Sequence, residues 1–264
     1  MPNNRSAELY VQLLDYSKAR LNDSLKKYAT FPSQLSFDKI FNSNCMSAMY
    51  DEQRNKKTFL PKASLWPKIC GLMETCDACK NFYLAQRSNL DKFRDIALGQ
   101  QFENEFMGFL NSMGIIAKRA DNKKKNAPDI QVVKNSSIVC FLEMKYLSAP
   151  FVLRNKFDKD RECYEGSTTL DSDQKILAQR SIVENEIESP VYYVYWLDYP
   201  CIKGIFFMES TDVYKYLDSV NNLEWTRKQR SGDFVGQFKV GHSEKVYLPL
   251  LKMGNFEELM GNLV

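Results

Sequence analysis

Two short stretches of the chain consist almost entirely of apolar residues, at positions 191–197 (VYYVYWL) and 204–208 (GIFFM). Apolar runs of this length, with no polar alternation, are typical of strands that are buried on both faces of a sheet. A sheet of that kind needs helices against it, and the sequence also predicts several helices. The chain is therefore expected to be an α/β protein.

The predicted helices and strands divide the chain into a helical first part and a second part that contains the sheet. Apolar residues at helical spacing predict helices over residues 6–30, 36–41, 65–86 and 90–113. Gly114 then provides a C-terminal cap, and the apolar period changes. Strands are expected at 115–119, 129–133, 138–146, 191–197, 204–208 and 245–250, and helices at 170–188 and 212–220. The second and third strands would form a hairpin.

The 264 residues contain a single histidine, His242, and this excludes several classes of enzyme. Zinc proteases of the HExxH type, HNH-type nucleases and other sites that need two or more histidines are excluded. The formal net charge is +3, from 36 basic and 33 acidic side chains. A nucleic-acid partner must therefore be argued from local basic patches and not from the total charge.

The N-terminus lacks the apolar stretch of a secretory signal, and no run reaches the roughly 18 apolar residues of a membrane span. The seven cysteines are an odd number, which favours free thiols in a reducing cytoplasm. Four of them could form a thiolate metal site, although their irregular spacing favours buried free cysteines: Cys45, Cys70, Cys76 and Cys79.

Charged side chains collect at the open end of the predicted hairpin. Asp129 begins its first strand, and Glu143 and Lys145 end its second strand on one face. A turn centred on Ser136 would place Asp129 opposite Glu143, with Cβ atoms about 4.5–5.5 Å apart. Two carboxylates so close repel each other unless a cation lies between them. A hard ion such as Mg²⁺ suits carboxylates and a backbone carbonyl, for which Met144 is the natural candidate.

The sequence Pro128-Asp129, followed by Glu143-Met144-Lys145, resembles the PD-(D/E)xK nuclease superfamily, which includes restriction endonucleases. Upstream, the segment GQQFE that ends at Glu103 is similar to the helix that precedes the first core strand of this family. The likeness covers about residues 93–210, in the order helix, three strands, helix, strand. It implies a restriction-endonuclease-like core, which is a mixed central sheet flanked by helices. Residues 93–264 would form this nuclease domain, and residues 1–92 a helical region for DNA recognition or dimerisation.

The resemblance implies a Mg²⁺-dependent endonuclease that hydrolyses DNA phosphodiester bonds with one or two ions. Asp129, Glu143 and the Met144 carbonyl would bind the metal. Lys145 would position or activate water, and Glu103 would have a supporting role. The simplest form is a type II restriction endonuclease, a homodimer that cuts a specific double-stranded sequence and can be accompanied by a cognate DNA methyltransferase. The alternatives are a structure-directed repair or recombination nuclease, an antiphage effector nuclease, and a catalytically inactive DNA-binding relative.

Basic and polar side chains flank the motif on both sides in sequence. They could neutralise the phosphate backbone near the scissile bond, or they could be solvated surface residues. The candidate nucleic-acid contacts are Lys123, Lys124, Lys125, Arg154, Lys156, Gln174 and Lys175.

Overall fold

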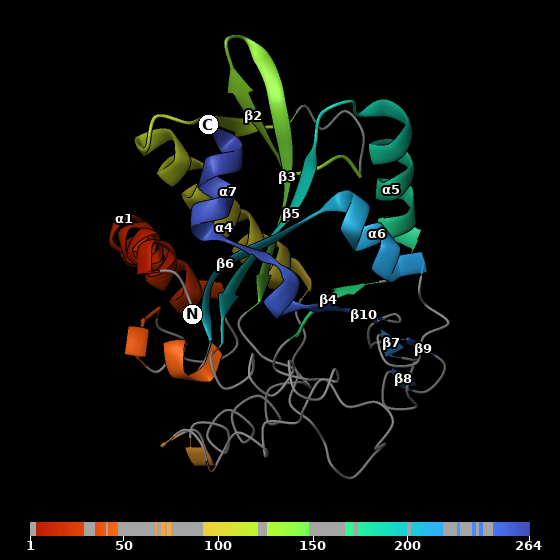
Figure 1. Ribbon diagram of the computed structural model, residues 1–264. Helices are drawn as coiled ribbons and strands as arrows, with labels where there is room; N and C mark the ends of the chain where they lie inside the picture. The colour runs from red at the N-terminus through yellow and green to blue at the C-terminus, as the bar shows by residue number, and fades with distance from the viewer. Residues whose placement is uncertain are drawn as a thin grey trace.

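The computed structural model describes most of the second half of the chain and selected parts of the first (Figure 1). The described residues are 4–28, 35–40, 42–46, 67, 70–71, 73–74, 92–120, 126–147, 167–171, 174–199, 202–218, 226–227, 234–235, 238–239 and 245–264. No helix among them is long and apolar enough to cross a membrane. His242, Cys76 and Cys79 lie outside these residues, whereas Cys45 is buried and Cys70 is exposed, both as free thiols.

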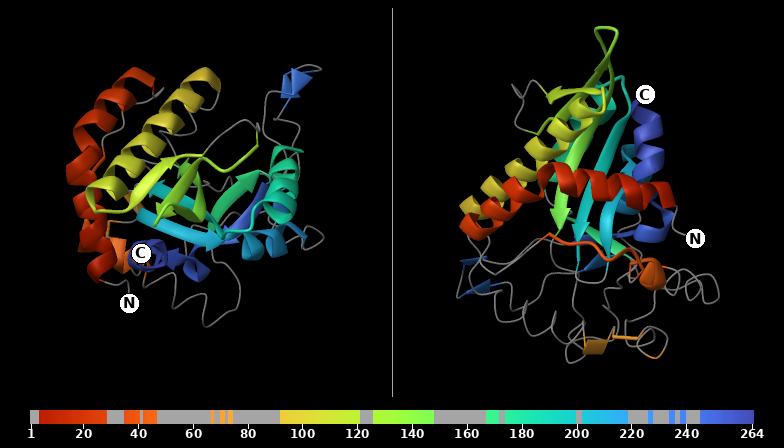
Figure 2. Two further views of the ribbon diagram at one scale, coloured as in Figure 1. Left: turned by 90° about the horizontal axis from the view of Figure 1, so that it is seen from above. Right: turned by 90° about the vertical axis from the view of Figure 1, so that its left-hand side faces the viewer.

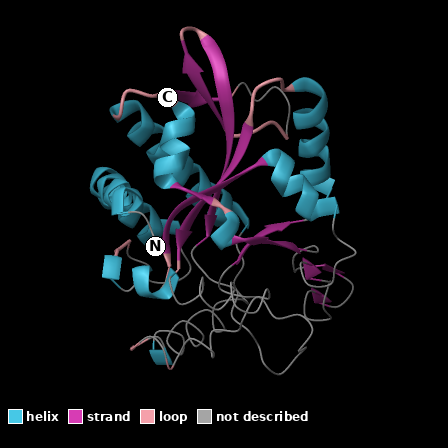
Figure 3. Ribbon diagram, viewed as in Figure 1, coloured by secondary structure: helices cyan, strands magenta, loops and turns pink. Residues whose placement is uncertain are grey.

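A six-stranded sheet forms the centre of the molecule, in the order β1-β2-β3-β5-β6-β11. Its strands are β1 (Ile116–Arg119), β2 (Ile130–Lys134), β3 (Ser137–Leu147), β5 (Val191–Asp198), β6 (Lys203–Glu209) and β11 (Gly254–Asn255). Strands β3 and β5 are parallel, and the other neighbouring pairs are antiparallel. The sheet is thus open and mixed, with helices on both sides, and the predicted α/β class is confirmed (Figure 3).

Three helices cover one face of the sheet: α1 (Asn4–Tyr28), α4 (Lys92–Ser112) and α7 (Phe256–Leu263). Helices α1 and α4 lie side by side (Figure 2) and share one hydrophobic cluster with the sheet. At its centre the indole of Trp196 meets Phe102 edge-on and donates a hydrogen bond to the Tyr10 hydroxyl at 3.2 Å. Helix α1 therefore packs on the same core as the strands. A folding boundary at residues 92 and 93 stays a prediction.

Helices α5 (Gln174–Glu186) and α6 (Ser210–Asp218) lie on the other face, over a second hydrophobic cluster. Tyr193 and Tyr195 point into this cluster, whereas Val194 and Trp196 point into the first one. Strand β5 is thus buried on both faces, as its apolar sequence predicts. The second cluster lies on the face of the sheet that carries the candidate site.

The β2–β3 hairpin is built differently from the prediction at its tip. Asn135 and Ser136 have φ angles of 50° and 65°, and positive φ at both central residues is the mark of a two-residue type I′ turn. The turn is therefore centred between these residues, so Val133 pairs with Ile138 and not with Val139. A β-bulge follows between Val132 and Val133, and it shifts the register by one residue. Beyond the bulge the strands therefore pair as predicted, with Val132 opposite Cys140 and Ile130 opposite Leu142.

Other elements depart from the prediction because their partners are distant in sequence. Residues 167–171 form strand β4 (Ser167–Asp171), so the helix predicted from residue 170 begins only at Gln174. Strand β4 pairs with β10 (Lys245–Pro249), and β10 also pairs with β7 (Thr226–Arg227). The strand predicted at 245–250 is therefore β10, and it belongs to a sheet separate from the central one. Strands β8 (Phe234–Val235) and β9 (Phe238–Lys239) form a two-stranded sheet, and η5 (Leu250–Lys252) is a 3₁₀ turn.

The helices near the two ends of the chain also differ from the prediction. Residues 35–38 are irregular, and helical turns occur at 39–40 and 42–46, later than predicted. The helix predicted over residues 65–86 lies almost entirely outside the described residues. Helix α7 was not predicted, although Asn255 and Glu258 form a capping box at its start.

Candidate active site

The hairpin register brings Asp129 level with Glu143. Ile130 pairs with Leu142. Asp129 comes directly before Ile130, and Glu143 comes directly after Leu142, so the next antiparallel pair would be Asp129 and Glu143. Both Ile130 and Leu142 belong to the cluster under α1 and α4. Because side chains alternate along a strand, Asp129 and Glu143 lie on the opposite face, on which α5 and α6 pack. The register thus extends as the prediction requires, and Glu143 is close enough for its negative charge to raise the pKa of Asp129.

Asp129 is held at the point where the ladder between β2 and β3 ends. Its Oδ2 accepts a hydrogen bond from the Met144 N–H at 2.9 Å, and its backbone carbonyl accepts one from the Ala120 N–H at 3.1 Å. In a strand, the N–H and C=O of one residue point to the same side. The Met144 carbonyl therefore also faces the side of the strand on which Asp129 lies.

Glu143 is 2% exposed, and hydrogen-bond donors reach both of its carboxylate oxygens. The Lys145 ammonium donates to Oε1 and is also an ion-pair partner. The side-chain amide of Gln179, from α5, donates to Oε2 at 2.7 Å. The Gln179 carbonyl in turn accepts a hydrogen bond from the Tyr193 hydroxyl at 2.8 Å. Both oxygens of this buried carboxylate are therefore held in place by hydrogen bonds.

The pKa of Asp129 is raised to about 7. Burial is the largest cause, and the negative charges of Glu143 and Glu103 add to it. The Lys145 ammonium and the Met144 N–H oppose the rise without cancelling it. Around neutral pH, Asp129 is thus partly protonated, and a cation bound between the two carboxylates would displace that proton.

Glu103 approaches the pair from α4 but has another charged partner. Its carboxylate accepts a hydrogen bond from the Arg119 guanidinium at 2.6 Å, and the Asn104 side-chain carbonyl accepts a second from the same group at 2.9 Å. In the part of the chain that the structure describes, no three His, Cys, Asp or Glu residues cluster closely enough to hold a metal ion. Glu103 acts on Asp129 through its charge, and a supporting catalytic role stays a prediction.

The donor set at this position fits a hard divalent cation. Asp129 and Glu143 would provide two carboxylates, and Met144 a backbone carbonyl. Mg²⁺ is commonly bound by one or two carboxylates and keeps several waters or substrate phosphate oxygens in its shell. Two carboxylates and a backbone carbonyl are therefore compatible with Mg²⁺.

Gln179 is a site residue that the sequence analysis missed. Ile176, Gln179 and Val183 are all buried and follow one another at helical spacing along one side of α5. A polar residue within such an apolar stripe is a signal for a buried hydrogen bond, and it was available in the sequence. Gln174 and Lys175, which were predicted instead, form the first turn of α5, and their side chains are outside the described part of the structure.

The face of the sheet beside the carboxylates continues toward the edge strand β1. Ala117 is buried in the cluster under α4, so its neighbour Lys118 lies on the face that carries Asp129 and Glu143. Lys118 is exposed and pairs with Gln131 of β2. The remaining predicted nucleic-acid contacts lie outside the described residues: Lys123, Lys124, Lys125, Arg154 and Lys156.

No family model matches the chain, and no curated protein matches it either.

Proposed function

We propose that this protein is a Mg²⁺-dependent endonuclease that hydrolyses DNA phosphodiester bonds. One observation supports the proposal above all others. Asp129 and Glu143 face each other across a hairpin end, with the ammonium of Lys145 bonded to the second carboxylate. Such a pair of acids is costly for a fold to hold together unless the site serves a cation. A lysine beside a cation site suits a substrate with a negatively charged phosphate.

Each residue of the site has a role that follows from its contacts. Asp129 and Glu143 would hold the ion, together with the Met144 carbonyl. When bound, Mg²⁺ supplies Lewis-acid stabilisation of the phosphate and lowers the pKa of a coordinated water. The Lys145 side chain is 29% exposed, so its ammonium can reach substrate as well as Glu143. In this position it would orient the attacking water or stabilise the negative charge that develops on the phosphate.

The more specific form of the proposal is a type II restriction endonuclease with a restriction-endonuclease-like core. Helix α4, strands β1–β3, helix α5 and strand β5 follow the order that the resemblance implies, with β4 inserted before α5. A homodimer would provide one site for each strand of double-stranded DNA. Cleavage at one sequence would distinguish this form from a repair, recombination or antiphage nuclease with the same chemistry.

Incubation of the protein with supercoiled plasmid and Mg²⁺, followed by sequencing of the ends, tests the proposal. We expect discrete fragments with one common end sequence, and no cleavage when EDTA is present. Nicking or general degradation would support the nuclease chemistry but contradict the restriction-enzyme form. No cleavage of single-stranded or double-stranded DNA by the folded protein would contradict the nuclease proposal.

Variants of the site then test its assignment. Asp129→Ala and Lys145→Ala should each abolish cleavage and leave DNA binding in a gel-shift assay intact. Two matched changes away from the site, Asp212→Ala on α6 and Lys134→Ala on β2, should leave cleavage unchanged. Full activity of either site variant would show that the residues were wrongly assigned.

A further inference from the structure

A chain of buried hydrogen bonds leads from helix α6 to Glu143. The hydroxyls of Tyr214 and Tyr193 lie 3.3 Å apart, Tyr193 donates to Gln179 at 2.8 Å, and Gln179 donates to Glu143 at 2.7 Å. All four residues are buried. The chain connects four elements, because Tyr214 belongs to α6, Gln179 to α5, Tyr193 to β5 and Glu143 to the neighbouring strand β3.

These hydrogen bonds can run in only one direction. A tyrosine hydroxyl has a single proton, and Tyr193 gives it to the carbonyl oxygen of Gln179. The proton between the two tyrosines must therefore come from Tyr214. The same bond assigns the Gln179 carbonyl to Tyr193 and its NH₂ group to Glu143, so the amide cannot flip without losing both partners. Burial raises the pKa of Tyr193 and of Tyr214, so both remain donors at neutral pH.

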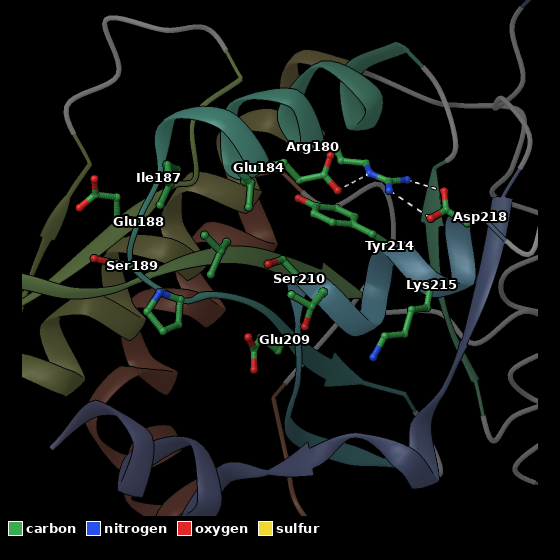
Figure 4. Close-up of a pocket in the computed structure, with 14 residues that line it drawn as sticks. Arg180, Glu184, Ile187, Glu188, Ser189, Glu209, Ser210, Tyr214, Lys215 and Asp218 are labelled. Atoms are coloured by element: carbon green, nitrogen blue, oxygen red, sulfur yellow. Dashed lines mark hydrogen bonds and ion pairs between the residues drawn. The ribbon is translucent and has the colours of Figure 1, made fainter.

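The outer end of the chain is fixed by a cluster of charged side chains between α5 and α6 (Figure 4). The Arg180 guanidinium lies over the Tyr214 ring, 5.1 Å from its centroid. Arg180 donates hydrogen bonds to Glu184 at 2.7 Å and to both carboxylate oxygens of Asp218. Arg180 directly follows Gln179 in α5. The guanidinium that contacts Tyr214 and the side-chain amide that contacts Glu143 therefore come from the same helical turn.

We propose that Gln179 is a positioning residue that fixes the carboxylate of Glu143 for binding of the metal ion, with Tyr193 and Tyr214 holding Gln179 in turn. The inference rests on the proposed function, because it assigns a purpose to the orientation of a metal ligand. Lys145 bonds Oε1 and Gln179 bonds Oε2, so the plane of the carboxylate is set by two donors. Without Gln179, the carboxylate is free to turn toward the ammonium and away from Asp129. Partners that orient metal ligands in this way contribute on the order of 10–100-fold to metal affinity.

The test uses the full chain and compares Gln179→Leu with Tyr193→Phe, and with Gln12→Leu on the exposed side of α1 as a matched control. Binding of Mn²⁺ to the free protein is measured by electron paramagnetic resonance, and the Mg²⁺ dependence of plasmid cleavage is measured separately. We expect Gln179→Leu to need on the order of tenfold more metal in both titrations, with kcat at saturating Mg²⁺ within a few-fold of the wild-type value. Tyr193→Phe should shift both titrations in the same direction by a smaller factor, and the control should shift neither.

Unchanged metal affinity in folded Gln179→Leu would overturn the inference, and so would a lower kcat at saturating Mg²⁺ with no change in affinity. Circular dichroism and thermal melting establish that each variant is folded. If Gln179→Leu does not fold, the result for Tyr193→Phe decides, since this variant loses one hydroxyl only. Wild-type protein that binds Mn²⁺ through Asp129 but cuts no DNA would refute the nuclease proposal alone, and the Mn²⁺ titrations would still decide the role of Gln179.

Discussion

Replacement of Asp129 by asparagine should make the protein more stable, by an amount that depends on pH. The pKa of Asp129 is about 7 in the folded protein, against an ordinary value of 3.8. Between these two values the folded chain binds a proton that the unfolded chain has already released. The stability contributed by protonated Asp129 is therefore present at low pH and is lost as the pH rises toward 7. Asparagine has no proton to lose, so its contribution should not change over this range.

The size of the effect follows from the shift in pKa. Each unit is equivalent to about 1.4 kcal/mol, so a shift of about three units sets a ceiling of about 4 kcal/mol. Asp129 is half-buried, which reduces the expected gain for Asp129→Asn to about 2–4 kcal/mol at pH 8. At pH 4 the two proteins should be about equally stable, because the aspartate is then protonated in the fold. The side-chain carbonyl of the introduced asparagine can still accept the hydrogen bond from the Met144 N–H.

Urea unfolding in EDTA at several pH values from 4 to 8 measures the difference in free energy of unfolding. Asp218→Asn is the matched control, because hydrogen bonds from Arg180 lower the pKa of Asp218. Removal of this carboxylate should therefore make the protein less stable at pH 8, and not more stable. With millimolar Mg²⁺, the wild-type protein should gain stability at pH 8 and Asp129→Asn should not. Parallel curves for the wild type and Asp129→Asn across this pH range would refute the reasoning.

Three further changes have defined outcomes. DNA affinity on a logarithmic scale falls linearly with the logarithm of salt concentration, and Lys118→Met, on the site face, should make this fall less steep by about 1, whereas Lys134→Met should not change it. A slope for Lys118→Met equal to that of the wild type would contradict a phosphate contact. Ser136→Gly should stabilise the hairpin by about 1 kcal/mol in thermal melts, because its φ of 65° favours glycine, and a loss of stability would contradict the type I′ turn. Gly254→Ala should cost about 1–3 kcal/mol, since a Cβ would meet a buried phenylalanine ring of β6. Gly261→Ala, in open space on α7, should instead stabilise by up to about 1 kcal/mol, and a similar cost for both would contradict the packing argument.

The alternation of apolar residues was enough to predict the hairpin and the central strands, because these elements depend on neighbours in sequence. It also predicted that Asp129 faces Glu143, although the predicted turn and the pairing next to it differ from those in the structure. The predicted turn was centred on Ser136, whereas the real turn lies half a residue earlier and the bulge restores the register. The correct pairing of the acids therefore came from two differences that cancel.

The features that the sequence did not reveal depend on contacts between distant segments. Strand β4 exists because it pairs with β10, which lies more than seventy residues later in the chain. The role of Gln179 depends on how α5 packs against Tyr193 and Glu143, and a local pattern cannot state which atoms meet there. Helix α7 is different, because the capping residues Asn255 and Glu258 are a local signal that could have been used.

The bulge of the β2–β3 hairpin has a consequence for how this hairpin can change in evolution. Substitutions near its tip leave the pairing of Asp129 with Glu143 unaffected, because neither acid takes part in the turn. A single-residue insertion or deletion is different, since it moves every later side chain of the strand to the other face unless a bulge is gained or lost with it. A change of two residues only lengthens or shortens the arms. Among relatives of this chain, the number of residues between the two acids should therefore vary in steps of two, and odd differences should coincide with the presence or absence of the bulge.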